Sequence, residues 1–189
     1  VEKSGFKNIY TFENHTNEAT MDLTLAKTIS GFSDYVKKIA PDLIVIHGDR
    51  VEALAGAIVG SLNNVLVAHI EGGEVSGTID ELLRHATSKM SHVHFVSNAT
   101  AKSRLIQMGE LEDSIYTIGS PDVDIMFSNE LPDLETVKTY YNIPFSTYNI
   151  VMFHPVTTEA AHMELYATSL VKALLKSNHN YVVIYPNND

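Results

Sequence analysis

The sequence has no cysteine among its 189 residues, so it can form neither a disulfide framework nor a zinc ribbon and has no thiol nucleophile. Positive charge is also scarce, because 13 Lys and Arg face 23 Asp and Glu, for a formal net charge of −10. An acidic chain without a basic run argues against binding to nucleic acid or to an anionic membrane surface. No apolar run approaches the roughly 20 residues that span a bilayer.

The chain opens without an initiator Met and without the apolar segment of a signal peptide, and we expect it to be part of a longer protein. What is present is an ordinary globular composition, with 44% apolar and 19% charged residues. This length predicts one large domain, or one domain plus part of another.

Short, β-branched apolar runs alternate with helical patterns along the chain, and no internal repeat is found. Such runs are typical of parallel strands covered on both faces. The alternation predicts βαβ units in an α/β fold with a doubly wound parallel sheet. The predicted strands are 43–46, 65–68, 93–96, 115–118, 150–153 and 181–185, and the predicted helices are 21–39, 51–62, 80–90, 99–108, 134–141 and 160–175.

The alternation is interrupted once, in a polar segment that contains Pro132 and Pro144. We interpret residues 128–148 as an interdomain linker. Residues 1–127 then form a first α/β domain, and residues 149–189 are the start of a second.

Polar residues gather where the predicted strands end, which is where parallel α/β sheets bind ligands. Asp49 follows the first strand, Glu71 and Glu74 follow the second, and Asp80 opens a helix. Each has an ordinary structural explanation, as a helix cap, a solvated turn or a favourable charge at a helix start. Gathered in one cleft, such acids would repel one another and at least one pKa would rise. That arrangement suits a reaction that needs both a proton donor and a base, or a divalent metal.

The signals for a metal and for common cofactors are weak. His92 and His94 alternate along a predicted strand, for which a packed or hydrogen-bonded role is favoured over a metal site. We interpret His69 and His85 as structural in the same way. The glycine-rich signatures of NAD-binding and P-loop proteins are absent, as is the Gly-x-Ser-x-Gly turn of serine hydrolases. The usual NAD-binding and P-loop sites are therefore not expected.

Five strings of residues, in order along the chain, carry a more specific signal. They are His47-Gly48-Asp49-Arg50, His69-Ile70-Glu71-Gly72-Gly73-Glu74 with the Ser76-Gly77-Thr78-Ile79-Asp80 and Arg84-His85 that follow, Ile118-Gly119-Ser120-Pro121, His154-Pro155-Val156-Thr157-Thr158-Glu159, and Pro186-Asn187. From about Pro41 onward the chain resembles the hydrolysing UDP-N-acetylglucosamine 2-epimerases, which make N-acetylmannosamine for sialic acid. Related enzymes act on UDP-N,N′-diacetylbacillosamine for legionaminic acid.

The resemblance implies a GT-B-like fold, in which two Rossmann-like domains face each other across a cleft. Residues 149–189 would then begin the UDP-binding domain, which is only partly present. The family normally begins with a strand and an Arg- and Lys-bearing loop that precede this chain, and its second domain continues further. We therefore expect the 189 residues alone to have little or no activity.

The resemblance also implies the functional residues. The catalytic acids are expected to be Asp49, Glu71 and Asp80. The residues expected to bind the UDP-sugar are Arg50, Glu74, His154 and Asn187, with His154 near the UDP phosphates.

The implied reaction eliminates UDP across C1 and C2 of the sugar to give a glycal, and water then adds with the opposite configuration at C2. Neither stage needs a metal or a redox cofactor. The implied partners are a UDP-sugar substrate and further copies of the chain in a cytoplasmic homodimer or homotetramer. Four alternatives stay open. They are the same chemistry on UDP-N,N′-diacetylbacillosamine, a non-hydrolysing UDP-GlcNAc 2-epimerase, a GT-B glycosyltransferase, and a non-catalytic nucleotide-sugar-binding module.

Overall fold

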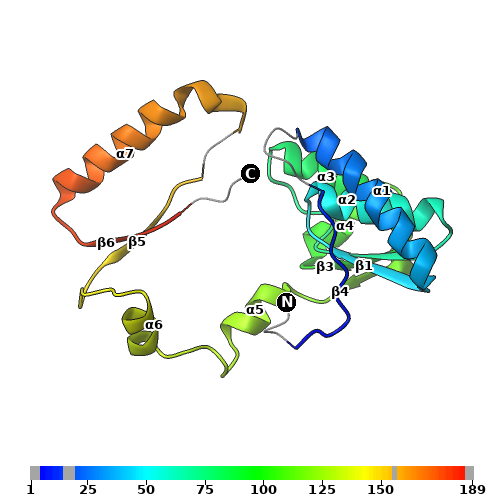
Figure 1. Cartoon of the computed structure of the whole chain (residues 1–189), viewed down its shortest axis with the longest axis horizontal. Helices are drawn as coiled ribbons and strands as arrows, with labels where there is room; N and C mark the ends of the chain where they lie inside the picture. The colour runs from blue at the N-terminus through cyan, green and yellow to red at the C-terminus, as the bar shows by residue number, and fades with distance from the viewer. Residues whose placement is uncertain (1–4, 15–19, 155–156, 186–189) are drawn as a thin grey trace. The chain divides into compact units, whose positions relative to one another are not determined.

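The computed structural model describes residues 5–14, 20–154 and 157–185, and Figure 1 shows the course of the chain. The chain divides into two compact units, Val1–Ser128 and Asn129–Asp189. Each unit contains its own parallel β-sheet with helices beside it. The predicted α/β class is therefore confirmed.

The first unit contains a four-stranded parallel sheet in the order β1-β2-β3-β4. Its strands are β1 (Leu43–His47), β2 (Leu66–Ile70), β3 (Val93–Val96) and β4 (Ile115–Thr117). Its helices are α1 (Met21–Ile39), α2 (Val51–Leu62), α3 (Ile79–Lys89), α4 (Ala99–Gln107) and α5 (Pro121–Met126), with a 3-10 turn η2 at Glu112–Ser114. Because all four strands run in the same direction, their carboxyl ends meet at one edge of the sheet.

Two apolar clusters hold this unit together. In the first, Val36 of α1 and Val59 of α2 pack on Ile44 of β1. In the second, α4 packs on β3 and β4 through Ala101, Leu105, Val96 and Ile115. Because side chains alternate along a strand, Leu43 and Val45 point to the other face of β1, where they are 47% and 57% exposed.

The second unit contains a two-stranded parallel sheet. Its elements are α6 (Leu134–Tyr140), β5 (Asn149–Met152), the 3-10 segment η3 (Thr157–His162), α7 (Met163–Ser177) and β6 (Tyr181–Ile184). Asn149 pairs with Tyr181, and Met152 with Ile184. None of the helices in the described parts of the chain is both long and apolar enough to cross a membrane.

Local details correct several sequence-based expectations. Helix α5 was not predicted, and helix α7 begins at Met163 because η3 occupies the residues before it. Thr78 directly precedes α3, but its hydroxyl donates to the Asp80 carboxylate and makes no cap hydrogen bond. Asn98 does cap α4, because its side chain accepts a hydrogen bond from the Ala101 amide.

Candidate functional site

The carboxyl edge of the four-stranded sheet carries most of the predicted site residues. The loops that leave this edge are tied to the neighbouring strands by main-chain hydrogen bonds. The Gly48 amide donates to Ile70 O at 3.1 Å, the Glu71 amide to Phe95 O at 2.8 Å, and the Ile118 amide to Val96 O at 2.9 Å. The residues directly after β1, β2 and β4 are therefore held in fixed positions.

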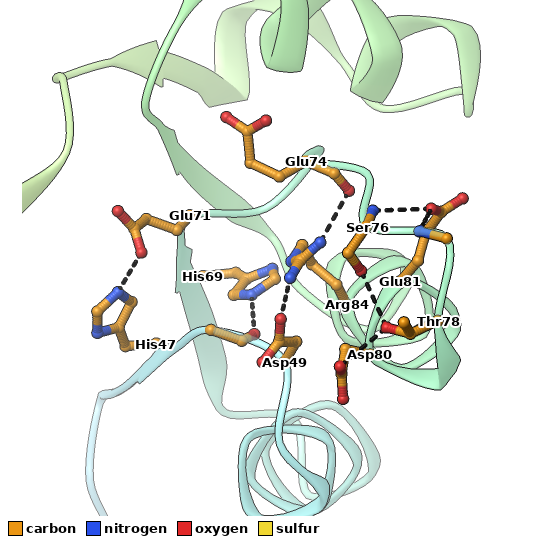
Figure 2. Close-up of polar contacts among 12 residues, drawn as sticks. His47, Asp49, His69, Glu71, Glu74, Ser76, Thr78, Asp80, Glu81 and Arg84 are labelled. Atoms are coloured by element: carbon orange, nitrogen blue, oxygen red, sulfur yellow. Dashed lines mark hydrogen bonds and ion pairs between the residues drawn. The ribbon is translucent and has the colours of Figure 1, made fainter. Parts of the chain in front are cut away.

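Glu71 is held through both of its carboxylate oxygens. Oε1 accepts a hydrogen bond from the Ser120 hydroxyl at 2.7 Å. Oε2 lies 2.7 Å from His47 Nε2, as Figure 2 shows. The Ser120 hydrogen bond, with a further contribution from His47, lowers the pKa of Glu71 below its usual value. Glu71 also has a φ of +64°, which places a non-glycine residue in the left-handed region. Such strained backbone is concentrated at functional sites.

Asp49 forms an ion pair with Arg84 of α3. The same guanidinium donates to the main-chain oxygen of Glu74 at 3.1 Å, so Arg84 lies between the loops after β1 and β2 (Figure 2). Only 12% of the Arg84 side chain and 27% of the Asp49 side chain are exposed, which limits screening of the pair by water. Asp49 was open to interpretation as the cap of α2, but the cap position is Arg50 and the Asp49 side chain turns to Arg84.

Asp80 lies in the first turn of α3 with an exposed side chain. Its Oδ2 accepts a hydrogen bond from Thr78 at 2.9 Å. The adjacent Glu81 accepts from the amides of Ser76 and Gly77 at 2.9 and 2.8 Å, which lowers the pKa of Glu81. These bonds shape the loop that brings Asp80 to the sheet edge (Figure 2).

The loop that carries Glu74 is fastened to α4. Asn98 Nδ2 donates to Glu74 Oε1 at 2.7 Å, and Arg104 donates to the main-chain oxygen of Gly73. Asn98 thus caps α4 and holds Glu74 at the same time. This double role links the start of a helix to a predicted substrate-binding residue.

The remaining predicted binding residues fall in three places. Arg50 lines an open hollow at the end of β1, together with Ile46, His47, Glu52 and Ala53. His154 lies two residues after β5 in the second unit, with an exposed side chain. Asn187 lies outside the described residues. Within the parts of the chain that the structure describes, no three His, Asp or Glu side chains are grouped so as to hold a metal ion.

Sequence reasoning assigned no role to several residues that contact the predicted acids. They are Arg84, His47, Ser120 and Asn98. The position of Arg84 could have been inferred from the sequence, because Arg84 follows Asp80 by four residues and so lies on the same face of the predicted helix. His47 and Ser120 were also findable, since both stand at or just after the ends of predicted strands.

Comparison with known proteins identifies the family of the chain. Residues 3–189 match the family described as UDP-N-acetylglucosamine 2-epimerase. The UDP-N-acetylglucosamine 2-epimerase of Neisseria meningitidis serogroup B is 51% identical over 189 residues, which cover 100% of this chain and 50% of that protein. The UDP-N,N′-diacetylbacillosamine 2-epimerase (hydrolyzing) of Legionella pneumophila is 34% identical over 176 residues, which cover 93% of this chain and 47% of that protein.

Among solved structures, the Methanocaldococcus jannaschii UDP-GlcNAc 2-epimerase in complex with UDP-GlcNAc and UDP has a TM-score of 0.81 at 21% identity. The match covers 99% of this chain and 53% of that one, and it confirms the predicted GT-B-like fold. The chain spans about half the length of the curated relatives that it matches. Because the family match extends over nearly all 189 residues, the chain belongs to the UDP-N-acetylglucosamine 2-epimerase family.

Proposed function

We propose that the chain carries the catalytic acids of a hydrolysing UDP-N-acetylglucosamine 2-epimerase, which converts UDP-GlcNAc and water to UDP and N-acetylmannosamine. The observation that carries the proposal is the arrangement of Asp49, Glu71 and Asp80 at one edge of the sheet, each with a different set of partners. Carboxylates in different environments can divide the roles of acid and base at one pH.

The proposed reaction has two stages. In the first, a carboxylate removes the proton from C2, a C1–C2 double bond forms, and the C1–O bond breaks so that UDP leaves with its electron pair. In the second, water adds its hydroxyl to C1 of the glycal while a carboxylic acid delivers a proton to C2 from the opposite face. The sum is UDP-GlcNAc plus water giving UDP plus N-acetylmannosamine.

The contacts of each acid support a division of roles. Glu71 has a lowered pKa and partners on both oxygens, which suits a residue that stays ionised as a base or that positions the sugar. Asp49 and Asp80 make fewer described contacts, and we assign general acid and base catalysis to them.

We assign Arg50, Glu74, His154 and Asn187 to the binding of the UDP-sugar. A positive charge helps UDP to leave, and His154 would supply one when protonated. The proposal includes a cytoplasmic location and assembly into dimers or tetramers. Light scattering during size-exclusion chromatography tests the assembly.

A second candidate is the same chemistry on UDP-N,N′-diacetylbacillosamine. It is favoured by the 34% identity to the Legionella pneumophila protein that is named for that activity. The two sugars differ at C4 and C6, and the three acids would act at C1 and C2 in either case.

The test is a proton NMR time course in D₂O on the full-length protein that contains this chain, with UDP-GlcNAc as substrate. Free UDP together with N-acetylmannosamine carrying deuterium at C2 is the expected result. Deuterated UDP-N-acetylmannosamine without free UDP would instead identify a non-hydrolysing epimerase. Inertness toward both UDP-GlcNAc and the diacetylbacillosamine nucleotide would contradict the proposal.

A further inference from the structure

His69 is a fully buried polar residue of β2, two positions before Glu71. Its Nε2 lies 2.8 Å from the main-chain oxygen of Gly48, and its Nδ1 lies 3.0 Å from the Ser88 hydroxyl of α3. A carbonyl oxygen can only accept, so Nε2 carries the ring proton and donates it to Gly48. Nδ1 then accepts from Ser88, and its two partners fix the tautomer of the ring.

The His69 ring is uncharged under ordinary conditions. Burial lowers its pKa to about 4, against the opposing effect of the hydrogen bond to Gly48. A neutral imidazole has one donor and one acceptor, and both are used here. The ring therefore acts as a fixed connection between α3 and the loop after β1.

Helix α3 and the loop after β1 are joined a second time, at Asp49. Gly48 is held at its amide, which donates to Ile70 O, and at its carbonyl, which accepts from His69. The next residue, Asp49, pairs with Arg84, which lies one helical turn before Ser88 on α3. Helix α3 thus fixes Asp49 in two ways, through His69 at the preceding carbonyl and through Arg84 at the carboxylate (Figure 2).

The chain after Glu71 packs against the same ring. A Cβ at Gly72 would lie 2.7 Å from Ser88 Oγ and 2.9 Å from His69 Nδ1, so a side chain there would force one of these two residues to shift. The loop after β1 and the loop after β2 are consequently both built on His69. A shift of this ring would move Asp49 and Glu71 relative to each other.

We propose that His69 is a positioning residue, whose imidazole, bonded to Ser88 and to the Gly48 carbonyl, orients the Asp49 carboxylate for proton transfer. This inference deepens the proposed function and rests on it. His69 itself is fully buried, so it sets the geometry of the acids without touching the sugar.

Two amide substitutions separate the two hydrogen bonds in the full-length protein. The amide nitrogen of His69→Gln reaches the place of Nε2 and can still donate to Gly48, whereas His69→Asn reaches only the place of Nδ1 near Ser88. We expect His69→Asn to lower kcat on the order of 10²-fold, as misplacement by about 1 Å does, and His69→Gln to stay within roughly ten-fold of the wild type. KM should change little in either variant.

The two variants are close in polarity and size, so thermal unfolding of both gives the correction for folded fraction. Equal kcat values for the Asn and Gln variants after that correction would overturn the proposal, because a merely structural role would not separate them. Nitrogen-15 NMR of the histidine rings supplies a readout independent of turnover. We expect a proton on Nε2 of His69 and none on Nδ1 between about pH 5 and pH 8.

A His69 ring that carries its proton on Nδ1, or that gains a second proton near pH 6.5, would also overturn the proposal. Failure of the wild-type protein to turn over any UDP-sugar would instead contradict the proposed function. In that event a crystal structure of His69→Asn decides the inference alone: it stands if the Asp49–Arg84 ion pair is lost and falls if the pair is kept.

Discussion

At the residue scale, the three acids differ in how tightly the fold holds them. Glu71 is held at both oxygens and in a left-handed backbone, and Asp49 is paired with a largely buried guanidinium. Asp80 is exposed and has one described hydrogen bond, from the hydroxyl of Thr78. The differences fit a site in which one carboxylate stays fixed while others exchange protons.

Removal of each acid should slow catalysis by the full-length protein. Asp49→Asn, Glu71→Gln and Asp80→Asn are each expected to lower kcat on the order of 10²-fold or more. At Asp49 and Asp80 the amide cannot exchange a proton as a carboxyl does, and at Glu71 it lacks the negative charge of the ionised carboxylate. Release of UDP in a steady-state assay measures the effect. Glu112→Gln is the matched control, since Glu112 is 66% exposed and pairs with Lys102 away from the acids. Near-normal turnover in all three acid variants would refute the assignment.

The hydroxyl of Ser120 should tune Glu71. It is the largest cause of the lowered pKa of Glu71, so Ser120→Ala is expected to raise that pKa. If catalysis requires Glu71 to be ionised, the acidic limb of the profile of kcat/KM against pH should move to higher pH. Ser114→Ala, which removes an exposed hydroxyl bonded to Leu111 O, should leave the limb in place. An unmoved limb in Ser120→Ala would show that another group sets it.

His69 should make the folded protein sensitive to mild acid. Its pKa is about 4 in the folded chain and near 6.5 in the unfolded one, so the unfolded state binds more protons between these values. The contribution is complete above about pH 6.5 and is lost as the pH falls toward 4, by about 3 kcal/mol in all. Urea unfolding at several pH values measures it. The loss should be smaller in His69→Gln, and equal losses in both proteins would contradict the prediction.

At the scale of elements, the loop Gly72–Glu74 is packed directly against α4. Gly73 has a φ of +80°, and a Cβ there would contact the main-chain oxygen of Ala101 at 2.5 Å. Gly77 has a φ of +68° with nothing within 4 Å of its Cβ position. The two glycines therefore share the backbone requirement but differ in packing.

This difference gives a matched pair of substitutions. Gly77→Ala should cost about 1–2 kcal/mol of unfolding free energy, from the left-handed backbone alone. Gly73→Ala should cost about 1–3 kcal/mol more, because the added methyl group also overpacks the contact with α4. Urea unfolding of both variants gives the comparison. Equal costs would mean that the loop can move away from α4.

Elements were predictable from the sequence because their signals are local. Helices α1 and α2 have the predicted bounds, since their apolar spacing and flanking residues lie within one segment. Helix α5 was missed because six residues give too short a pattern to recognise. The ion pair between Asp49 and Arg84 joins residues 35 positions apart, and no local pattern reports such a contact. Its formation depends on the order of strands in the sheet.

At the scale of the whole molecule, the sequence was informative where loops leave parallel strands. The strings that begin at His47 and His69 carry the family resemblance, and the family match confirms it. The roles of all the predicted site residues stay predictions. His154 lies in the second unit and Asn187 outside the described residues.

The position of β1 has a consequence for laboratory work. In the described part of the chain, β1 pairs with β2 along one side, and Leu43 and Val45 are exposed on one face. An open strand edge beside apolar side chains is a template for aggregation. The 189-residue chain prepared alone should form larger particles as its concentration rises, and Val45→Lys should suppress them, as dynamic light scattering would measure. The open edge of β1, a strand of five residues, would then limit the concentration of such a sample more than the acidic surface does.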